Sequence, residues 1–153
     1  EGWEQIESDV VGEWYTYLML AKGYRPETQL DDETAREASE GWGGDTYQIY
    51  SNPINNQTVL IMKTTWDTNQ DAKEFYDVFK IYGKTRWGLP SSRFTLYTWF
   101  MNLLHGMKMS SLVTTWQTDA QSVEIRYDSS STIVIIAPDA NTRDLLMQSI
   151  VEN

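Results

Sequence analysis

The stretch from residue 41 to residue 75 places the tightest constraint on what this chain can fold into. It opens with a glycine-rich run, Gly41-Trp42-Gly43-Gly44-Asp45, whose glycines permit backbone angles closed to other residues. The run is not a phosphate-binding loop, because no Gly-Lys-Ser/Thr follows it and because it comes before a strand rather than opening a helix. Its expected role is a tight turn that ends one helix and starts a strand.

Two strands and a helix are predicted after this turn. Residues 46–51 and 58–66 are rich in β-branched and aromatic side chains, and turn-forming residues join them as a hairpin. The second of these segments carries apolar side chains on both faces, which predicts a central strand. A helix capped by Asp67 or Thr68 follows and is expected to end at Gly83.

The C-terminal part of the chain repeats this order of elements. A strand is predicted at 112–117, and residues 122–128 alternate apolar with charged side chains, which indicates a strand with one solvated face. A short apolar strand at 132–136 follows, and Asp139 or Asn141 then caps a last helix. Residues 122–151 thus repeat the strand, strand, helix order of residues 46–82, with negligible sequence identity between the two copies.

Two helices are predicted ahead of the glycine-rich run. Residues 4–22 carry apolar side chains at spacings of three and four, Trp14 among them, which is typical of one long amphipathic helix. A second helix begins at Asp31 or Asp32. We therefore expect an α+β fold: one antiparallel sheet built from two strand-strand-helix units, with the N-terminal helices packed against it, in a single domain over residues 1–153.

The segment 94–109 is apolar nearly all round. We expect it to be core, either as a buried helix or as a strand followed by a short helix. The alternative is an exposed patch for a partner protein or a lipid surface. No stretch reaches about 18 uninterrupted apolar residues, so no membrane span is predicted in this chain.

Composition excludes several classes of function. The 12 Lys and Arg against 22 Asp and Glu give a formal net charge of −10, which repels phosphate backbones and makes nucleic acid a poor partner. The chain has no cysteine, which removes thiol nucleophiles and cysteine-ligated metals. Aromatic residues make up 13% of the chain, so we expect an aromatic-rich core.

Candidate catalytic residues are few. His105 is the one histidine, which rules out a zinc site with two histidines from one chain, and no Gly-x-Ser-x-Gly motif accompanies it. Asp45 and Asp67 are the carboxylates to consider first for glycoside hydrolysis, but turn and cap chemistry explains both more simply. We therefore assign no catalytic residue, no metal ligand and no cofactor.

Aromatic side chains are the better candidates for a binding site. Tryptophan rings can form a stacking platform for sugars or other flat ligands, although most tryptophans fill cores. Trp87 stands in a polar segment and is the one expected at the surface. The candidate ligand-binding set is Trp42, Asp45, Trp66 and Trp87, drawn from the wider group Trp3, Trp42, Trp66, Trp87, Trp99 and Trp116.

A recurring pattern of residues carries a resemblance. It comprises Gly12-Glu13, Ala35 and Ala38 before the glycine-rich run, then Trp66-Asp67 and Ala72-x-Glu74-Phe75. The pattern resembles uncharacterised domains of secreted or lipid-anchored bacterial proteins, some of which also carry metallopeptidase-like segments. The resemblance implies an extracytoplasmic setting and no assigned activity, and no His-Glu-x-x-His motif is present to carry over.

Three functions remain open from the sequence. The first is a non-catalytic extracytoplasmic domain that binds a partner protein or a neighbouring domain. The second is a small-ligand or glycan-binding module that uses surface aromatics. The third, which fewer observations favour, is a carboxylate-dependent hydrolase.

Overall fold

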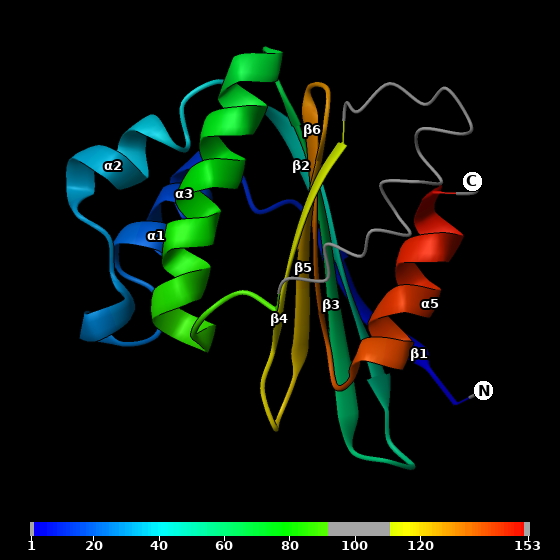
Figure 1. The fold of residues 1–153 in the computed structure, drawn as a ribbon. Coiled ribbons are helices and arrows are strands. Elements are labelled where there is room, and N and C mark those ends of the chain that lie inside the picture. The colour runs from blue at the N-terminus through cyan, green and yellow to red at the C-terminus, as the bar shows by residue number, and fades with distance from the viewer. Residues whose placement is uncertain (1, 92–110, 152–153) are drawn as a thin grey trace, which may run out of the picture.

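A computed structural model of the chain describes residues 2–91 and 111–151. Six strands form one antiparallel sheet in the order β1-β2-β3-β6-β5-β4, with helices on both of its faces (Figure 1). In chain order the described elements are β1 (Glu4–Asp9), α1 (Glu13–Ala21), the short 3-10 helix η1 (Pro26–Thr28), α2 (Asp32–Glu37), β2 (Trp42–Asn52), β3 (Gln57–Trp66), α3 (Asn69–Trp87), β4 (Ser111–Gln117), β5 (Ser122–Asp128), β6 (Ser131–Ala137) and α5 (Ala140–Val151).

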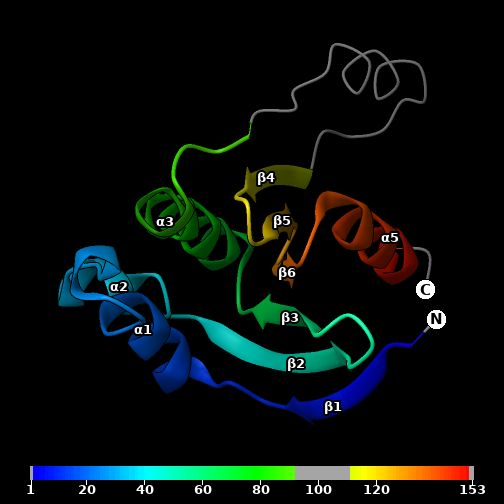
Figure 2. The ribbon, with the colours of Figure 1, turned by 90° about the horizontal axis from the view of Figure 1, so that it is seen from below.

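The mixed α+β class is confirmed, but the helices are placed differently from the prediction. α1, α2 and α3 lie on one face of the sheet, whereas α5 lies on the opposite face (Figures 1 and 2). The covering helices are therefore not all N-terminal. The reason lies in the central strands β3 and β6, which carry apolar side chains on both faces and so require cover from both sides.

The helix expected over residues 4–22 is wrong in its first half. β1 pairs antiparallel with β2 at the edge of the sheet, and only the second half of the segment is helical, as α1. The apolar spacing is not a buried stripe, because Ile6, Val10 and Trp14 are 60%, 53% and 65% exposed. Pairing with β2 outweighs the local helical periodicity, since tertiary context overrides weak propensity.

The predicted hairpin is confirmed as β2 and β3, although β2 begins earlier than expected. Gly43 and Gly44 lie inside β2, where a bulge shifts the register against β3. β3 is central, as predicted, because it pairs with β2 on one side and with β6 on the other. Met62 and Trp66 contribute to the core on the α3 side, and Val59 to the core on the α5 side.

α3 begins as predicted and ends later. Thr68 caps it in a capping box with Asp71, which supplies the reciprocal hydrogen bond. The helix continues through Gly83 to Trp87, so the expected end at Gly83 is wrong. Gly83 is needed for packing: a Cβ placed there would lie 2.4 Å from the ring of Trp116.

The larger core lies between the sheet and α3 and is rich in aromatic side chains, as composition predicts. Neighbouring rings pack at centroid distances such as 4.8 Å for Trp66 and Phe75. Tilted and edge-on contacts of this kind add to the stabilisation from area burial. Its aromatic members include Trp66, Phe75, Tyr76, Phe79, Tyr82, Trp87 and Trp116.

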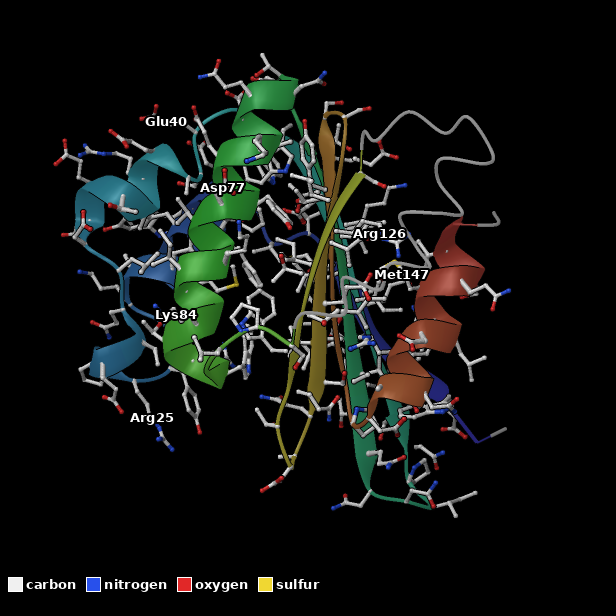
Figure 3. The ribbon with its side chains drawn as sticks, in the orientation of Figure 1. Arg25, Glu40, Asp77, Lys84, Arg126 and Met147 are labelled. Atoms are coloured by element: carbon white, nitrogen blue, oxygen red, sulfur yellow. The ribbon has the colours of Figure 1, made fainter. Side chains whose placement is uncertain are left out.

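The C-terminal elements β4, β5, β6 and α5 appear where the sequence predicts them. Asp139 caps α5, because its carboxylate accepts a hydrogen bond from the backbone N–H of Thr142 (2.8 Å). The solvated face predicted for β5 is wrong, since Glu124 on that face is only 4% exposed. α5 covers it, and Figure 3 shows Arg126 and Met147 on this side of the sheet.

A buried ion cluster fixes α5 to β5. The guanidinium of Arg143 donates to the Ser122 hydroxyl (2.8 Å), and its Nε lies 3.5 Å from a Glu124 oxygen. Glu124 also accepts a hydrogen bond from Arg126 (3.1 Å). A buried carboxylate needs such partners, because an unpaired charge in this position is costly.

Two expectations fall outside the described residues. The apolar segment 94–109 lies there, together with His105 and Trp99. Within the described residues, no helix has the length and apolarity needed to cross a membrane.

Candidate functional site

Asp45 joins the connection between β1 and α1 to the sheet. From β2 its carboxylate accepts hydrogen bonds from the backbone N–H groups of Val11 (2.7 Å) and Gly12 (2.8 Å), and from the indole N–H of Trp42 (2.7 Å). Bonds to an ionised acceptor are shorter and stronger than neutral ones. Both carboxylate oxygens are therefore occupied by structural partners, which leaves Asp45 poorly suited to acid–base chemistry.

A second joint ties the start of β2 to the start of α3. The carbonyl of Gly41 accepts a hydrogen bond from the backbone N–H of Asp67 (2.7 Å), and Gly41 has a φ of +74°, which favours glycine. A Cβ on Gly41 would lie 2.4 Å from the carboxyl group of Asp71, the capping-box residue of α3. The glycine-rich run therefore forms the start of β2 and its contact with the start of α3, and it is not a ligand-binding loop.

The structure does not bring the four expected ligand-binding residues together at the surface. Trp42 and Asp45 are half-buried and bonded to each other. Trp66 is 2% exposed, and its indole N–H donates to the Thr132 hydroxyl (3.0 Å) inside the core. This set therefore offers no open aromatic platform.

The surface position expected for Trp87 is wrong. Because α3 continues past Gly83, the Trp87 ring turns onto the core, with centroid distances of 5.6 Å to Trp116 and 5.9 Å to Phe79. It is 8% exposed, and the guanidinium of Arg86 lies 4.9 Å from its ring centroid. Trp87 is thus a core residue, and the Arg86 guanidinium forms a cation–π contact with its ring.

The described residues instead present an open strand edge at β1. β1 is the last strand of the sheet, so one of its long sides has no strand partner, and all six of its residues are exposed (Figure 2). An exposed edge carries unpaired backbone N–H and C=O groups and can accept a further strand. The backbone N–H of Ser8 donates a hydrogen bond to the side chain of its neighbour Glu7 (3.1 Å).

The opposite edge of the sheet is already engaged. In β4, the carbonyl of Thr115 accepts a hydrogen bond from the backbone N–H of Ser91 (2.8 Å), and the Thr115 hydroxyl donates to the Ser91 carbonyl (2.9 Å). The chain that follows α3 therefore occupies part of that edge. Of the two edge strands among the described residues, β1 is therefore the one whose outer side is not hydrogen-bonded to another described segment.

A bulge aligns the acidic side chains of β1. The register against β2 shifts between Gln5 and Glu7, so that Ile6 is the extra residue. Glu4, Glu7 and Asp9 then stand opposite alternate residues of β2, and side chains opposite alternate residues share one face. We call Glu4, Glu7 and Asp9 the acidic row.

The ionisation of Tyr47 reflects this arrangement. Tyr47 is half-buried in β2 and stands opposite Asp9. Desolvation of its hydroxyl, and then the negative charges of Glu7 and Asp9, raise the pKa of Tyr47 above its ordinary value. Glu7 and Asp9, two members of the acidic row, therefore act electrostatically on the same side chain of β2.

Exposed apolar side chains continue from β1 into α1. Trp14 and Tyr15 are each 65% exposed, and Trp14 packs against Tyr17 at a centroid distance of 5.1 Å. Ile6 and Val10 are exposed as well, and we call these four residues, which all fall between residues 6 and 15, the N-terminal apolar patch. Large exposed apolar side chains are unusual on a protein surface unless they contact another molecule.

Sequence reasoning missed this surface because it placed Trp14 on the buried face of a single helix. One sequence signal against that helix was present: Gly12 falls inside it, and glycine costs about 1 kcal/mol in a helix interior. In the structure Gly12 has a φ of +82° and stands between β1 and α1.

Within residues 2–91 and 111–151, no group of three or more histidine or acidic side chains is placed to hold a metal ion.

Comparison with known proteins gives one match. Neither the curated proteins nor the solved structures include a match to this chain. A family model described as a domain of unknown function, DUF8575, matches residues 3–147. The match includes every described strand and most of α5. The chain therefore belongs to the DUF8575 family.

Proposed function

We propose that this chain is a non-catalytic domain that binds a partner protein through the open edge of β1. The observation that carries the proposal is an edge strand whose six residues are all exposed, and the exposed residues of the N-terminal apolar patch lie in this strand and in the residues that follow it in the chain. Such an edge adds an extended segment by forming backbone hydrogen bonds, while side-chain contacts set the specificity. The occupied oxygens of Asp45 weigh against the carboxylate-dependent hydrolase.

The acidic row determines which segments fit. A segment with Lys or Arg at alternate positions places cations beside Glu4, Glu7 and Asp9, and cross-strand pairs of opposite charge are favourable. Two copies of β1 paired with each other would instead oppose acid to acid, which is unfavourable. The partner we propose is therefore a cationic, extended segment of another protein or of a neighbouring domain.

A peptide series tests this proposal. We expect a peptide of alternating Lys and Val to bind with a dissociation constant in the micromolar range, measured by calorimetry at low salt. A version with proline in place of two Val residues keeps the charge but loses two backbone N–H donors. We expect its affinity to be at least about tenfold lower. A Glu and Val peptide should not bind.

Matched variants locate the binding site. Neutralising the acidic row as Glu4→Gln, Glu7→Gln and Asp9→Asn should weaken binding of the Lys and Val peptide by about tenfold. The control is Glu33→Gln, Glu37→Gln and Glu40→Gln, an equal change in net charge at exposed positions in or just after α2. Equal losses in the two variants would show a general attraction to an acidic protein and would contradict the proposal.

The cellular setting is part of the same proposal. We place the domain on the outer side of a membrane, in a secreted or lipid-anchored protein, on the basis of the resemblance of its motif. Protease treatment of intact cells followed by immunodetection tests this setting. Degradation of the domain in intact cells supports it, and protection until the cells are lysed contradicts it.

The internal organisation belongs to the proposal as well. We propose that residues 1–153 form one domain in which β2, β3 and α3 make one unit and β5, β6 and α5 the other. The pairing of β3 with β6 supports this, because it joins the two groups at the centre of the sheet. A single unfolding transition, coincident for fluorescence and circular dichroism, is expected; two separate transitions would contradict it.

A further inference from the structure

The α5 side of the sheet holds a groove that is separate from the acidic row. It has a volume of about 750 Å³ and lies between α5 and the strands β2 and β3. Pockets of about 300–1,000 Å³ are typical for small organic ligands. Its apolar lining includes Trp3, Tyr50, Ile61, Leu145, Leu146 and Ile150.

The groove exists because α5 is held to one side. Arg143 fixes the start of α5 to Ser122 and Glu124 of β5, and Met147, 3% exposed, packs with Ile135 of β6. α5 therefore covers β5 and β6, and no helix of the described residues covers the remaining part of the apolar face of β2 and β3. Val59 of β3 also lines the groove, and it is only 1% exposed because neighbouring side chains pack around it.

The residues that line the groove include one positive charge and no negative charge. Lys63, at the exposed end of the β3 portion, is the one charged residue among those that line it. The side chain of Lys63 forms no hydrogen bond or ion pair with the described part of the chain. The remaining polar lining residues, Gln48, Thr142 and Ser149, are uncharged. An apolar channel with a single cation at its rim is complementary to an apolar chain that carries one negative charge.

We propose that this groove binds a free long-chain carboxylate, with its alkyl chain between α5 and the sheet and its head group beside Lys63. Burial of each methylene group in such a channel is favourable, so affinity should rise with chain length. An anionic bilayer is a poor alternative, because a protein with a net charge of −10 is repelled from it. This proposal does not depend on the proposed role of β1.

Calorimetry with soluble amphiphiles that differ either in chain length or in charge tests the proposal. Dodecanoate below its micellar concentration should bind with one-to-one stoichiometry, and octanoate should bind at least about tenfold more weakly. Dodecyltrimethylammonium, which has the same chain and the opposite charge, should bind about tenfold more weakly than dodecanoate. Vesicles of phosphatidylglycerol should not retain the protein.

Variants of exposed groove residues locate the ligand without threatening the core. Lys63→Gln should weaken dodecanoate binding by about fivefold, the effect of one exposed ion pair. Leu145, which is 60% exposed, lines the groove, and Leu145→Gln should weaken binding by about threefold or more through lost apolar contact. Trp3→Phe should remove most of the fluorescence change that accompanies binding.

Matched controls distinguish this site from general adsorption. Lys84→Gln and Leu89→Gln alter exposed residues of the same types away from the groove and should leave the affinity unchanged. Absence of dodecanoate binding would overturn the proposal. Equal affinity for the cationic amphiphile, equal losses in the control variants, or binding to vesicles instead of monomeric dodecanoate would also overturn it.

Discussion

At the scale of single residues, capping chemistry follows from local sequence, whereas long-range hydrogen bonds do not. Thr68 and Asp139 cap their helices as the sequence predicts, because the groups that they bond lie within three residues. For Asp45 the sequence allows both turn chemistry and ligand binding, because its hydrogen-bond partners Val11 and Gly12 lie 34 and 33 positions away. No pattern in a single sequence identifies such partners.

Replacing Asp45 tests its role in the joint between β1 and α1. Asp45→Ala removes three hydrogen bonds to one carboxylate, and we expect a loss of about 3 kcal/mol in the free energy of unfolding. The matched control is Asp67→Ala, at an exposed position before α3, which should change stability by about 0.5 kcal/mol or less. Urea denaturation measures both. Equal effects would mean that the carboxylate of Asp45 does not hold the joint.

Gly83 tests whether packing against Trp116 outweighs helix propensity. Alanine is favoured over glycine in a helix by about 1 kcal/mol, so an unhindered Gly83→Ala would stabilise α3. Because the new Cβ would lie 2.4 Å from the buried Trp116 ring, we expect a net loss of about 1–2 kcal/mol instead. Thermal and urea unfolding supply the measurement, with Lys84→Ala as the exposed neighbour for comparison. A more stable Gly83→Ala variant would refute the packing.

The pKa of Tyr47 tests the geometry of the acidic row. Because its pKa is raised in the fold, the contribution of Tyr47 to stability is present below its unfolded pKa of about 10 and is lost at higher pH. Neutralising Glu7 and Asp9 should lower the pKa of Tyr47 without restoring its ordinary value, since desolvation remains. Tyrosine-selective NMR titration, assigned with Tyr47→Phe, follows the change. An unaltered pKa would place these acids elsewhere.

At the scale of elements, the sequence predicts the strands that are apolar on both faces and misassigns the one that is exposed. β3 and β6 are recognisable because burial on both faces leaves nearly continuous apolar runs. β1 has no buried face, so only its pairing with β2 makes it a strand. Residue type likewise suggests four candidate ligand residues, but it does not predict their exposure. In the structure Trp42 and Asp45 are half-buried, and Trp66 and Trp87 are buried.

The attachment of α5 makes a prediction at this scale. Arg143→Ala leaves Glu124 buried with Arg126 as its remaining partner, and we expect a loss of about 2–3 kcal/mol in stability. The double variant Arg143→Ala with Glu124→Gln should lose less than the sum of the two single variants, because no buried carboxylate then lacks the partner that Arg143 provides. Chemical denaturation of the single and double variants measures the coupling. Additive effects would show that the two groups do not interact.

At the scale of the whole molecule, composition and periodicity predict the fold class and the aromatic core. They do not predict which helices cover which face of the sheet. Placing α5 on the face opposite α3 depends on the packing of both faces of the central strands, which no local pattern encodes. The same arrangement places β1 at one edge of the sheet and α5 on the face opposite α3 (Figure 2). It thereby produces two separate surfaces, an acidic, open edge at β1 and an apolar groove beside α5. Neither is recognisable before the sheet order is known.

Backbone hydrogen exchange in the presence of the alternating Lys and Val peptide tests the central claim most directly, because an added strand protects amides along the edge that it joins. The account predicts that exchange slows at alternate amides of β1, between residues 4 and 9, and is unchanged in β4. Unchanged exchange in β1 at saturating peptide, or protection confined to another surface, would contradict the claim that β1 is the binding edge.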